Sequence, residues 1–216
     1  MVLKIMIDEG YIKYQCHWQN KPIITSTEIK ELNQWRDRLY QLNLIGQYDD
    51  GIGFGNISIR DVEPEYFIIS GTQTGGIPHL SVEHYTKVIE FDWKTNSVTC
   101  IGSIKASSET LTHAALYVAN PEIKAVIHVH NLALWQKLIN KVSTTDINCA
   151  YGTPETAEEI IRLCQEEETK KLKIIVMSGH QEGIITFGRS LTEAGNILLN
   201  YFNEVIAPKT SIMLAR

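Results

Sequence analysis

Two histidines stand two positions apart in the segment Val126-Ile127-His128-Val129-His130. Their apolar and β-branched neighbours predict a buried strand, and successive side chains of a strand alternate between its faces, so both imidazoles lie on one face. Histidine is the commonest metal ligand in proteins, and two imidazoles leave room to complete a tetrahedral site. The motif therefore indicates a divalent metal site. A pair of hydrogen-bonded histidines at a strand end is the alternative that the motif alone leaves open.

Two other segments offer groups that bind anions. Residues 46–56 contain four glycines, and glycine lets backbone N–H groups approach a phosphate closely, here at Gly55-Asn56. Ser107-Ser108-Glu109 begins a predicted helix, and a helix N-terminus attracts negative charge. The alternatives are an ordinary connection between strands for the first segment and ordinary capping serines for the second.

Hydrophobic periodicity predicts the elements that must position these residues. A capping-box pattern, Thr25-Ser26-Thr27-Glu28, begins the first helix, and His180 falls in the turn between the last two strands. The order of elements predicts an α/β fold with a mixed sheet flanked by helices. Helices are expected over 25–46, 107–121, 131–141, 153–169 and 190–205, and strands over 57–60, 66–69, 85–92, 97–101, 123–130, 173–177 and 184–187, after a β-hairpin over 2–18.

The composition predicts one globular domain over residues 1–216, with the hairpin as an N-terminal extension over 1–20. The chain is 44% hydrophobic and 21% charged, which is sufficient for a single core. Its net charge of -5 comes with no basic block, so nucleic-acid binding has little electrostatic support. The chain lacks a secretory leader and a run of about 18 apolar residues, so we expect a soluble cytoplasmic protein. Its four cysteines lack C-x-x-C spacing, which predicts reduced thiols.

Seven motifs together resemble the class II aldolase/adducin family in order and spacing, over roughly residues 30–205. An isolated pair of histidines is weak evidence, but the full set is specific. The motifs are Gly55-Asn56-Ile57-Ser58, Ile69-Ser70-Gly71-Thr72, Lys105-Ala106-Ser107-Ser108-Glu109, His113-Ala114-Ala115-Leu116-Tyr117, Ala125-Val126-Ile127-His128-Val129-His130, Tyr151-Gly152-Thr153-Pro154-Glu155 and Gly179-His180.

The resemblance implies a role for each matching residue. It implies that zinc or another divalent metal is held by His128, His130 and His180, and that Glu109 serves as the acid/base. It places a substrate phosphate against Gly55, Asn56, Thr72, Ser107 and Ser108. It further implies a largely antiparallel sheet sandwiched between helices in three layers, and a homotetramer with active sites near the subunit interfaces.

The implied function is that of a zinc-dependent aldolase, which cleaves a small phosphorylated keto-sugar by retro-aldol chemistry. A sugar-phosphate 4-epimerase or dehydratase at the same metal site is the alternative, as is a non-catalytic adducin-like binding module. Two departures from the family stand out. Residues 131–150 contain no tyrosine, where family aldolases have one thought to donate a proton, and Gly179-His180-Gln181-Glu182 replaces the usual Asn-His-Gly. His113 follows Glu109 by four residues on the same helix face, where contact with the core is the favoured interpretation.

Overall fold

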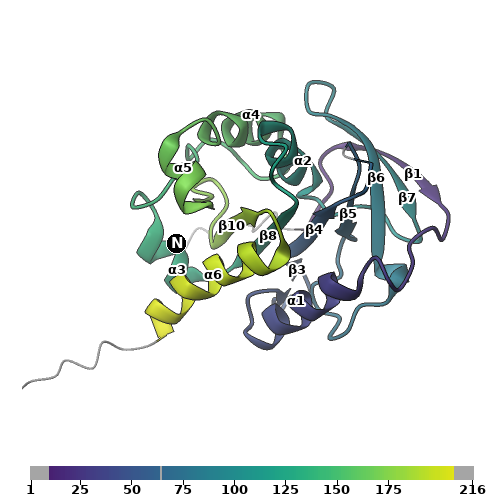
Figure 1. The fold of residues 1–216 in the computed structure, drawn as a ribbon, viewed down its shortest axis with the longest axis horizontal. Coiled ribbons are helices and arrows are strands. Elements are labelled where there is room, and N and C mark those ends of the chain that lie inside the picture. The colour runs from purple at the N-terminus through teal and green to yellow at the C-terminus, as the bar shows by residue number, and fades with distance from the viewer. Residues whose placement is uncertain (1–9, 64, 207–216) are drawn as a thin grey trace, which may run out of the picture.

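The computed structural model of the protein describes residues 10–63 and 65–206, and its centre is an eight-stranded sheet (Figure 1). The strand order is β1-β7-β6-β5-β4-β8-β10-β9. Neighbouring strands are antiparallel except β1 and β7, which are parallel. The predicted mixed, largely antiparallel sheet is therefore confirmed. The strands are β1 (Gln15–Asn20), β4 (Asn56–Arg60), β5 (Phe67–Ser70), β6 (Tyr85–Asp92), β7 (Ser97–Gly102), β8 (Ala125–His130), β9 (Ile174–Val176) and β10 (Gly183–Gly188).

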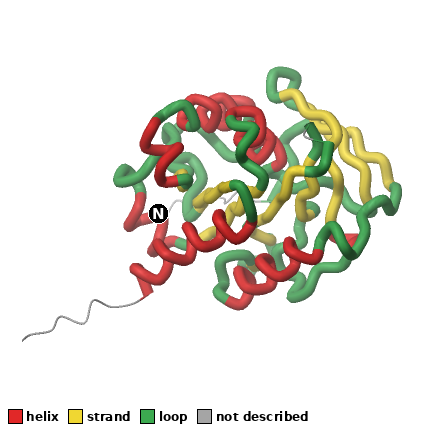
Figure 2. Tube along the Cα trace, in the orientation of Figure 1, coloured by secondary structure: helices red, strands yellow, loops and turns green. Residues whose placement is uncertain are grey.

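Helices cover both faces of this sheet, so the three-layer prediction is confirmed (Figures 1 and 2). One core cluster joins one face of the sheet to α1 (Lys30–Gln41), α3 (Leu132–Leu138) and α6 (Leu191–Ile206). The other cluster joins the opposite face to α2 (Thr110–Ala119) and α4 (Pro154–Leu163), which is followed by α5 (Glu167–Leu172). The short strands β2 (Gly46–Gln47) and β3 (Gly53–Phe54) pair separately, and the 3-10 helix η1 (Val82–His84) precedes β6.

The central strand β8 is buried along its whole length and alternates between the two cores. Ile127 and Val129 belong to the cluster under α1 and α6, whereas Val126 belongs to the cluster under α2 and α4. Because side chains two positions apart share a face, His128 and His130 point to the side of Val126. The two histidines therefore lie on the sheet face that α2 covers.

Helix α1 shows how sequence pattern and packing combine. Its buried face contains Leu32, Trp35 and Leu39, at three- and four-residue steps. A Cβ atom on Gly195 of α6 would lie 2.1 Å from Trp35 Cζ3, so the close approach of the two helices requires glycine there. At the other end of α1, Asn43 has a φ of 54°, a left-handed conformation that stops the helix.

The predicted helix over 25–46 is thus too long, because the α-helix spans Lys30–Gln41. The capping-box bonds are present, since the Thr25 backbone N–H donates to Glu28 Oε2 at 2.8 Å and the Glu28 N–H donates to Thr25 Oγ1 at 3.4 Å. They close a turn that precedes the helix. The helix predicted over 131–141 similarly ends at Leu138, ahead of Asn140 with a φ of 60°.

One predicted helix, over 153–169, is wrong as a single element. The backbone of Glu166 is extended, and this residue separates α4 from α5. The reorientation buries Thr169 completely, with its hydroxyl 2.5 Å from the hydroxyl of Ser143. A tertiary contact thus overrides the continuous helical pattern. Within the described ranges, no helix is both long enough and apolar enough to cross a membrane.

The N-terminal segment is described from Gly10 onward, so the first arm of the hairpin predicted over 2–18 lies outside the described residues. Strand β1 pairs with β7 in parallel, with Gln15 opposite Ser97 and Asn20 opposite Gly102. The hairpin and the single-domain boundary stay predictions. The second predicted hairpin is confirmed, because β6 and β7 pair in antiparallel register across the turn 93–96.

Candidate metal centre

His128 and His130 converge at the C-terminal end of β8. Their Nε2 atoms lie 3.1 Å apart, and their exposed fractions are 0% and 3%. Strands β4 and β10 flank them, with Asn56 opposite His128 and Gly183 opposite His130. The period of the strand therefore places both imidazoles together, as the sequence predicts.

His180 reaches the same point from the turn between β9 and β10. One ligand atom from each of His128, His130 and His180 lies within 4.8 Å of the other two. The ring centroid of His180 is 5.2 Å from that of His128 and 4.7 Å from that of His130. All three rings are buried, so the structure brings together the three ligands that the family resemblance implies.

The donor set fits a divalent cation. Burial, together with the neighbouring His180 ring, lowers the pKa values of His128 and His130 well below the usual value, so both rings are neutral. Neutral imidazole is the form that binds a metal. Two nitrogens bound tetrahedrally at about 2.0–2.1 Å from zinc lie about 3.4 Å apart, close to the separation of 3.1 Å between the two Nε2 atoms. Three histidines leave an open coordination position, which is typical of catalytic zinc.

Glu109 completes the cluster from the N-terminus of α2. Its side chain is 1% exposed, and Oε1 lies 3.5 Å from His180 Nδ1. The backbone N–H of Glu109 donates to Ser107 Oγ at 3.3 Å, which holds the residue at the start of the helix. A buried carboxylate is thus available for proton transfer beside the histidines.

The predicted anion-binding segments lie side by side and are joined by hydrogen bonds. The Ile57 N–H donates to Ser70 Oγ at 3.2 Å, and the Thr72 N–H donates to the Lys105 carbonyl at 3.0 Å. Ser107 and Ser108 are each 5% exposed, and Thr72 is half-buried. The residues implied for phosphate binding therefore belong to three hydrogen-bonded neighbouring segments.

Two of the remaining predicted residues differ in environment. Gly55 has a φ of +75°, and a Cβ atom there would lie 3.2 Å from the His128 carbonyl oxygen, so glycine is required. Asn56 is 6% exposed, and its Oδ1 makes no hydrogen bond within the described parts of the chain. His113 is fully buried with Nδ1 2.7 Å from Ser58 Oγ, which confirms its interpretation as a core residue.

Several aromatic and charged contacts to the histidines were not predicted. Tyr151 stacks on His180 with centroids 4.7 Å apart, and Lys13 Nζ lies 3.7 Å from the Tyr151 centroid. Tyr48 Oη lies 2.8 Å from His130 Nδ1. Tyr151 stands in a family motif and Tyr48 in the glycine-rich segment 46–56, but no sequence pattern indicates that Tyr48 or Lys13 lies near the histidines. Their positions depend on how distant segments fold together.

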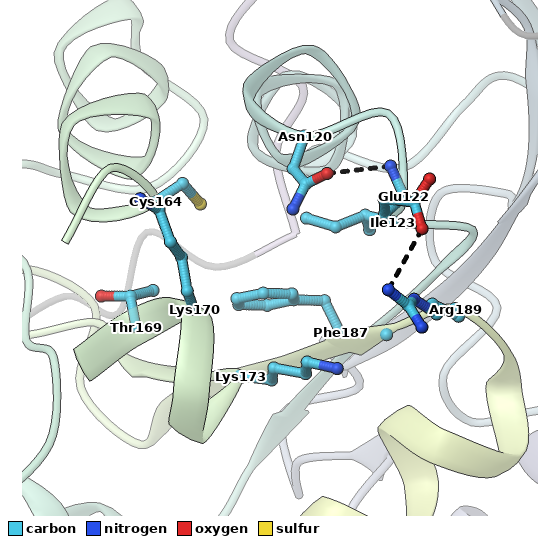
Figure 3. Close-up of a pocket in the computed structure, with 10 residues that line it drawn as sticks. Asn120, Glu122, Ile123, Cys164, Thr169, Lys170, Lys173, Phe187 and Arg189 are labelled. Carbon is cyan, nitrogen blue, oxygen red and sulfur yellow. Dashed lines mark hydrogen bonds and ion pairs between the residues drawn. The ribbon is translucent and has the colours of Figure 1, made fainter. Parts of the chain in front are cut away.

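A separate cavity of about 240 Å³ lies at the opposite end of β10 (Figure 3). Phe187, Ile123, Lys173 and Arg189 are among the residues that line it. Arg189 pairs with Glu122 at 3.2 Å, and Lys173 pairs with Glu193. None of the lining residues belongs to the histidine cluster, so this cavity is distinct from the metal centre.

A comparison with protein families identifies this arrangement. The family described as "Class II Aldolase and Adducin N-terminal domain" matches residues 47–201, which include the three histidines and Glu109. The chain belongs to the class II aldolase and adducin family. Its buried triad of His128, His130 and His180 is consistent with a divalent metal site.

Relatives within the class II aldolase and adducin family differ in their reactions. The chain is 30% identical over 105 residues to the probable L-ribulose-5-phosphate 4-epimerase of Mycoplasma pneumoniae, a match that covers 47% of this chain and 41% of that protein. It is 35% identical over 83 residues to the 3-oxo-tetronate 4-phosphate decarboxylase of Haemophilus influenzae, covering 38% of this chain and 35% of that protein. The matched part is thus less than half the length of either relative.

A solved structure supports the fold. An L-fuculose 1-phosphate aldolase superposes with a TM-score of 0.62 at 18% identity, covering 86% of this chain and 85% of that chain. At this level of identity the likeness establishes the class II aldolase fold.

Proposed function

We propose that the protein is a zinc-dependent lyase that cleaves a small phosphorylated keto-sugar by retro-aldol chemistry. The observation that supports this most strongly is the convergence of three buried imidazoles from two β-segments with a helix-borne carboxylate, Glu109 Oε1 lying 3.5 Å from His180 Nδ1. A structural zinc site is normally closed by four protein ligands, whereas three histidines leave a position for substrate.

Zinc and Glu109 have separate roles in the proposed reaction. When bound, zinc supplies a Lewis acid that polarises a carbonyl, an effect of several kcal/mol. Glu109 is the general acid/base in this proposal, because its carboxylate is buried beside the metal ligands and held by the helix start. Such a group contributes about 10²–10⁴-fold to a rate. The burial of Glu109 also excludes bulk water from the proton it transfers.

The phosphate of the substrate is proposed to bind at the joined segments that contain Asn56, Thr72 and Ser108. Ser108 lies at the beginning of the α2 helix, where backbone N–H groups and the helix dipole favour negative charge. Asn56 lies opposite His128 in the register of β4 and β8, so its amide is beside the metal centre. This arrangement would hold the phosphate and the carbonyl of one substrate at the same time.

A second candidate keeps the metal centre and changes the reaction. The matches to an epimerase and to a decarboxylase favour it, because each names a sugar-phosphate substrate and a different outcome. A dehydratase belongs to the same group of reactions. The adducin-like binding module is disfavoured by the retention of a complete histidine triad, which a non-catalytic head has no reason to keep buried and neutral.

We also propose that the protein is a homotetramer, as the family resemblance implies. Residues 131–150 contain no tyrosine to protonate the leaving group, so the donor must lie elsewhere in the chain or in a neighbouring subunit. Light scattering during size-exclusion chromatography measures the assembly, and a monomer at micromolar concentration would refute the tetramer.

The function is tested by elemental analysis followed by a product screen. Purified protein is expected to contain one divalent metal per chain and to turn over at least one member of a ketose-phosphate panel. Mass spectrometry separates the reactions: an aldolase gives two fragments, an epimerase an isomer of unchanged mass, a dehydratase the loss of one water, and a decarboxylase the loss of CO₂.

Two variants make this test specific to the site. Glu109→Gln is expected to lower turnover by about 10²–10⁴-fold while the metal content stays unchanged. Glu122→Gln is the matched control, because Glu122 lies at the surface in an ion pair with Arg189. Absence of stoichiometric metal in the wild type would refute the enzyme proposal. Full turnover by Glu109→Gln would refute the assigned acid/base.

A further inference from the structure

The hydroxyl of Tyr48 lies between His130 and a carboxylate from a distant part of the chain. Tyr48 Oη is 2.8 Å from His130 Nδ1 and donates to Glu182 Oε2 at 3.0 Å. Tyr48 lies between β2 and β3, and Glu182 immediately precedes β10. Tyr48 belongs to the glycine-rich segment 46–56, and Glu182 belongs to the segment after His180, where the sequence departs from the family motif.

The chemistry of the three groups sets the direction of the hydrogen bonds. An ionised carboxylate only accepts, so the Tyr48 hydroxyl uses its single proton toward Glu182. Tyr48 Oη must then accept from His130, which assigns the proton of the neutral imidazole to Nδ1. The lone pair of His130 is therefore on Nε2, the atom that lies 3.1 Å from His128 Nε2. The chain of bonds selects the tautomer that can bind a metal.

Aromatic packing holds the same ring from another side. Phe54 stacks on His130 with centroids 5.5 Å apart and an interplanar angle of 29°. Tyr48 in turn contacts Phe54, with centroids 4.6 Å apart. A Cβ atom on Gly46 would lie 2.9 Å from Phe54 Cζ, so the loop packs tightly behind these rings. The loop that contains Tyr48 is thus fixed relative to His130.

The backbone at Glu182 is strained. Its φ is 71°, in the left-handed region that glycine adopts freely and glutamate adopts at a cost of about 1 kcal/mol or more. The Glu182 carbonyl accepts from the Asn131 N–H at 3.1 Å, and this bond joins the strained turn to the end of β8. Glycine would relieve the strain and retain the backbone bond. Glycine would suit the backbone at this position better than glutamate does. The presence of glutamate is therefore explained by its side chain, which accepts the hydrogen bond from Tyr48.

We propose that Tyr48 and Glu182 are positioning residues that orient His130, select its Nδ1–H tautomer and raise the affinity of the three-histidine site for a divalent cation. This inference rests on the metal site of the proposed function. Partners that orient a metal-binding histidine typically change metal affinity by 10–100-fold when they are removed. The negative charge of Glu182, relayed through Tyr48, also increases the basicity of His130 toward a cation.

Zinc affinity tests the inference, measured by competition with a chromophoric chelator at neutral pH. The variants Tyr48→Phe and Glu182→Gly are expected to bind Zn²⁺ about 10- to 100-fold more weakly than the wild type. The matched controls are Tyr201→Phe, on α6, and Asn140→Gly, which replaces another residue of positive φ. Both controls are expected to keep wild-type zinc affinity.

The thermal midpoint of the metal-free protein separates positioning from folding. Glu182→Gly is expected to leave this midpoint unchanged or higher, because it relieves the strain at a φ of 71°. A second variant, Glu182→Gln, keeps the side-chain volume and is expected to weaken zinc binding in the same direction. A loss of zinc affinity without a loss of stability in these variants supports the proposal.

The tautomer of His130 gives an independent readout. Long-range ¹H–¹⁵N spectra of the metal-free wild type are expected to show the proton on Nδ1 of His130, and this preference should be lost in Tyr48→Phe. Wild-type zinc affinity in Tyr48→Phe and Glu182→Gly would overturn this inference and leave the proposed function intact. Absence of zinc binding by the wild type would overturn both.

Discussion

The most direct test of the candidate metal centre is a single methyl group placed between two of its proposed ligands. In Gly183→Ala, the new Cβ atom would lie 3.0 Å from the His180 carbonyl oxygen, 3.1 Å from His180 Nδ1 and 3.2 Å from His128 Cε1. Non-bonded heavy atoms prefer separations of about 3.5–4.0 Å. Each ring must therefore move away by at least about 0.3–0.4 Å. Gly183 itself has no positive φ, so alanine is compatible with its backbone conformation, but the contact with the His180 carbonyl oxygen requires a small shift of the turn.

The expected loss of zinc affinity follows from how little a metal–ligand distance can change. Metal–ligand distances hold within about 0.2 Å, so the required displacement exceeds what the coordinated rings can absorb. In the metal-free protein the two rings can separate, whereas in the loaded protein the cation holds them together. The part of the overpacking cost of about 1–3 kcal/mol that comes from the two rings therefore appears in metal affinity, whereas the part that comes from the His180 carbonyl oxygen applies with or without the metal. We expect Gly183→Ala to bind zinc about 10- to 100-fold more weakly.

The assay is zinc competition at neutral pH, with Gly188→Ala as the matched control on the same strand. A Cβ atom there would lie 2.8 Å from Oε2 of Glu193, whose partly buried side chain pairs with Lys173, and Gly188 is at the end of β10 opposite to Gly183. Gly188→Ala is expected to keep wild-type zinc affinity even if the stability changes. Equal affinities of wild type and Gly183→Ala would refute the assigned ligand geometry, as would an equal loss in both variants.

Three further outcomes are expected. Burial lowers the pKa of His113 to about 3 in the folded protein. As the pH falls below about 6.5, His113 therefore binds a proton in the unfolded chain but stays neutral in the folded protein. Unfolding in urea should therefore show about 2 kcal/mol less stability at pH 5 than at pH 8 from this residue, a loss that His113→Gln removes. Ser108→Ala should raise the KM for a phosphorylated substrate about tenfold with metal content unchanged, whereas an unphosphorylated analogue should be unaffected. Removal of the metal by a chelator should lower the thermal midpoint, and zinc at 100-fold excess over its Kd should restore about 2.7 kcal/mol. A midpoint that does not respond to zinc would argue against a metal bound only by the folded state.

The parts of the fold that were predictable are those with a short-range pattern. The two-residue period of β8 sets His128 and His130 on one face, and the spacing of Leu32, Trp35 and Leu39 gives α1 its buried side. These outcomes depend only on the geometry of a single strand or helix. The ends of elements were less predictable, since the break between α4 and α5 depends on a buried contact of Thr169 with Ser143.

The same distinction between local pattern and tertiary packing applies to the candidate metal centre. The residue types and spacing of His128 and His130, with the order of the family motifs, determined which side chains to expect as ligands. Only the tertiary structure decided that Tyr48 would meet His130 and that Glu182 would meet Tyr48, because these residues are 82 and 134 positions apart in the chain. Contacts across such separations depend on the packing of whole elements, which no local periodicity encodes. The sequence thus determined which residues are the proposed ligands, and the tertiary structure decided their environment.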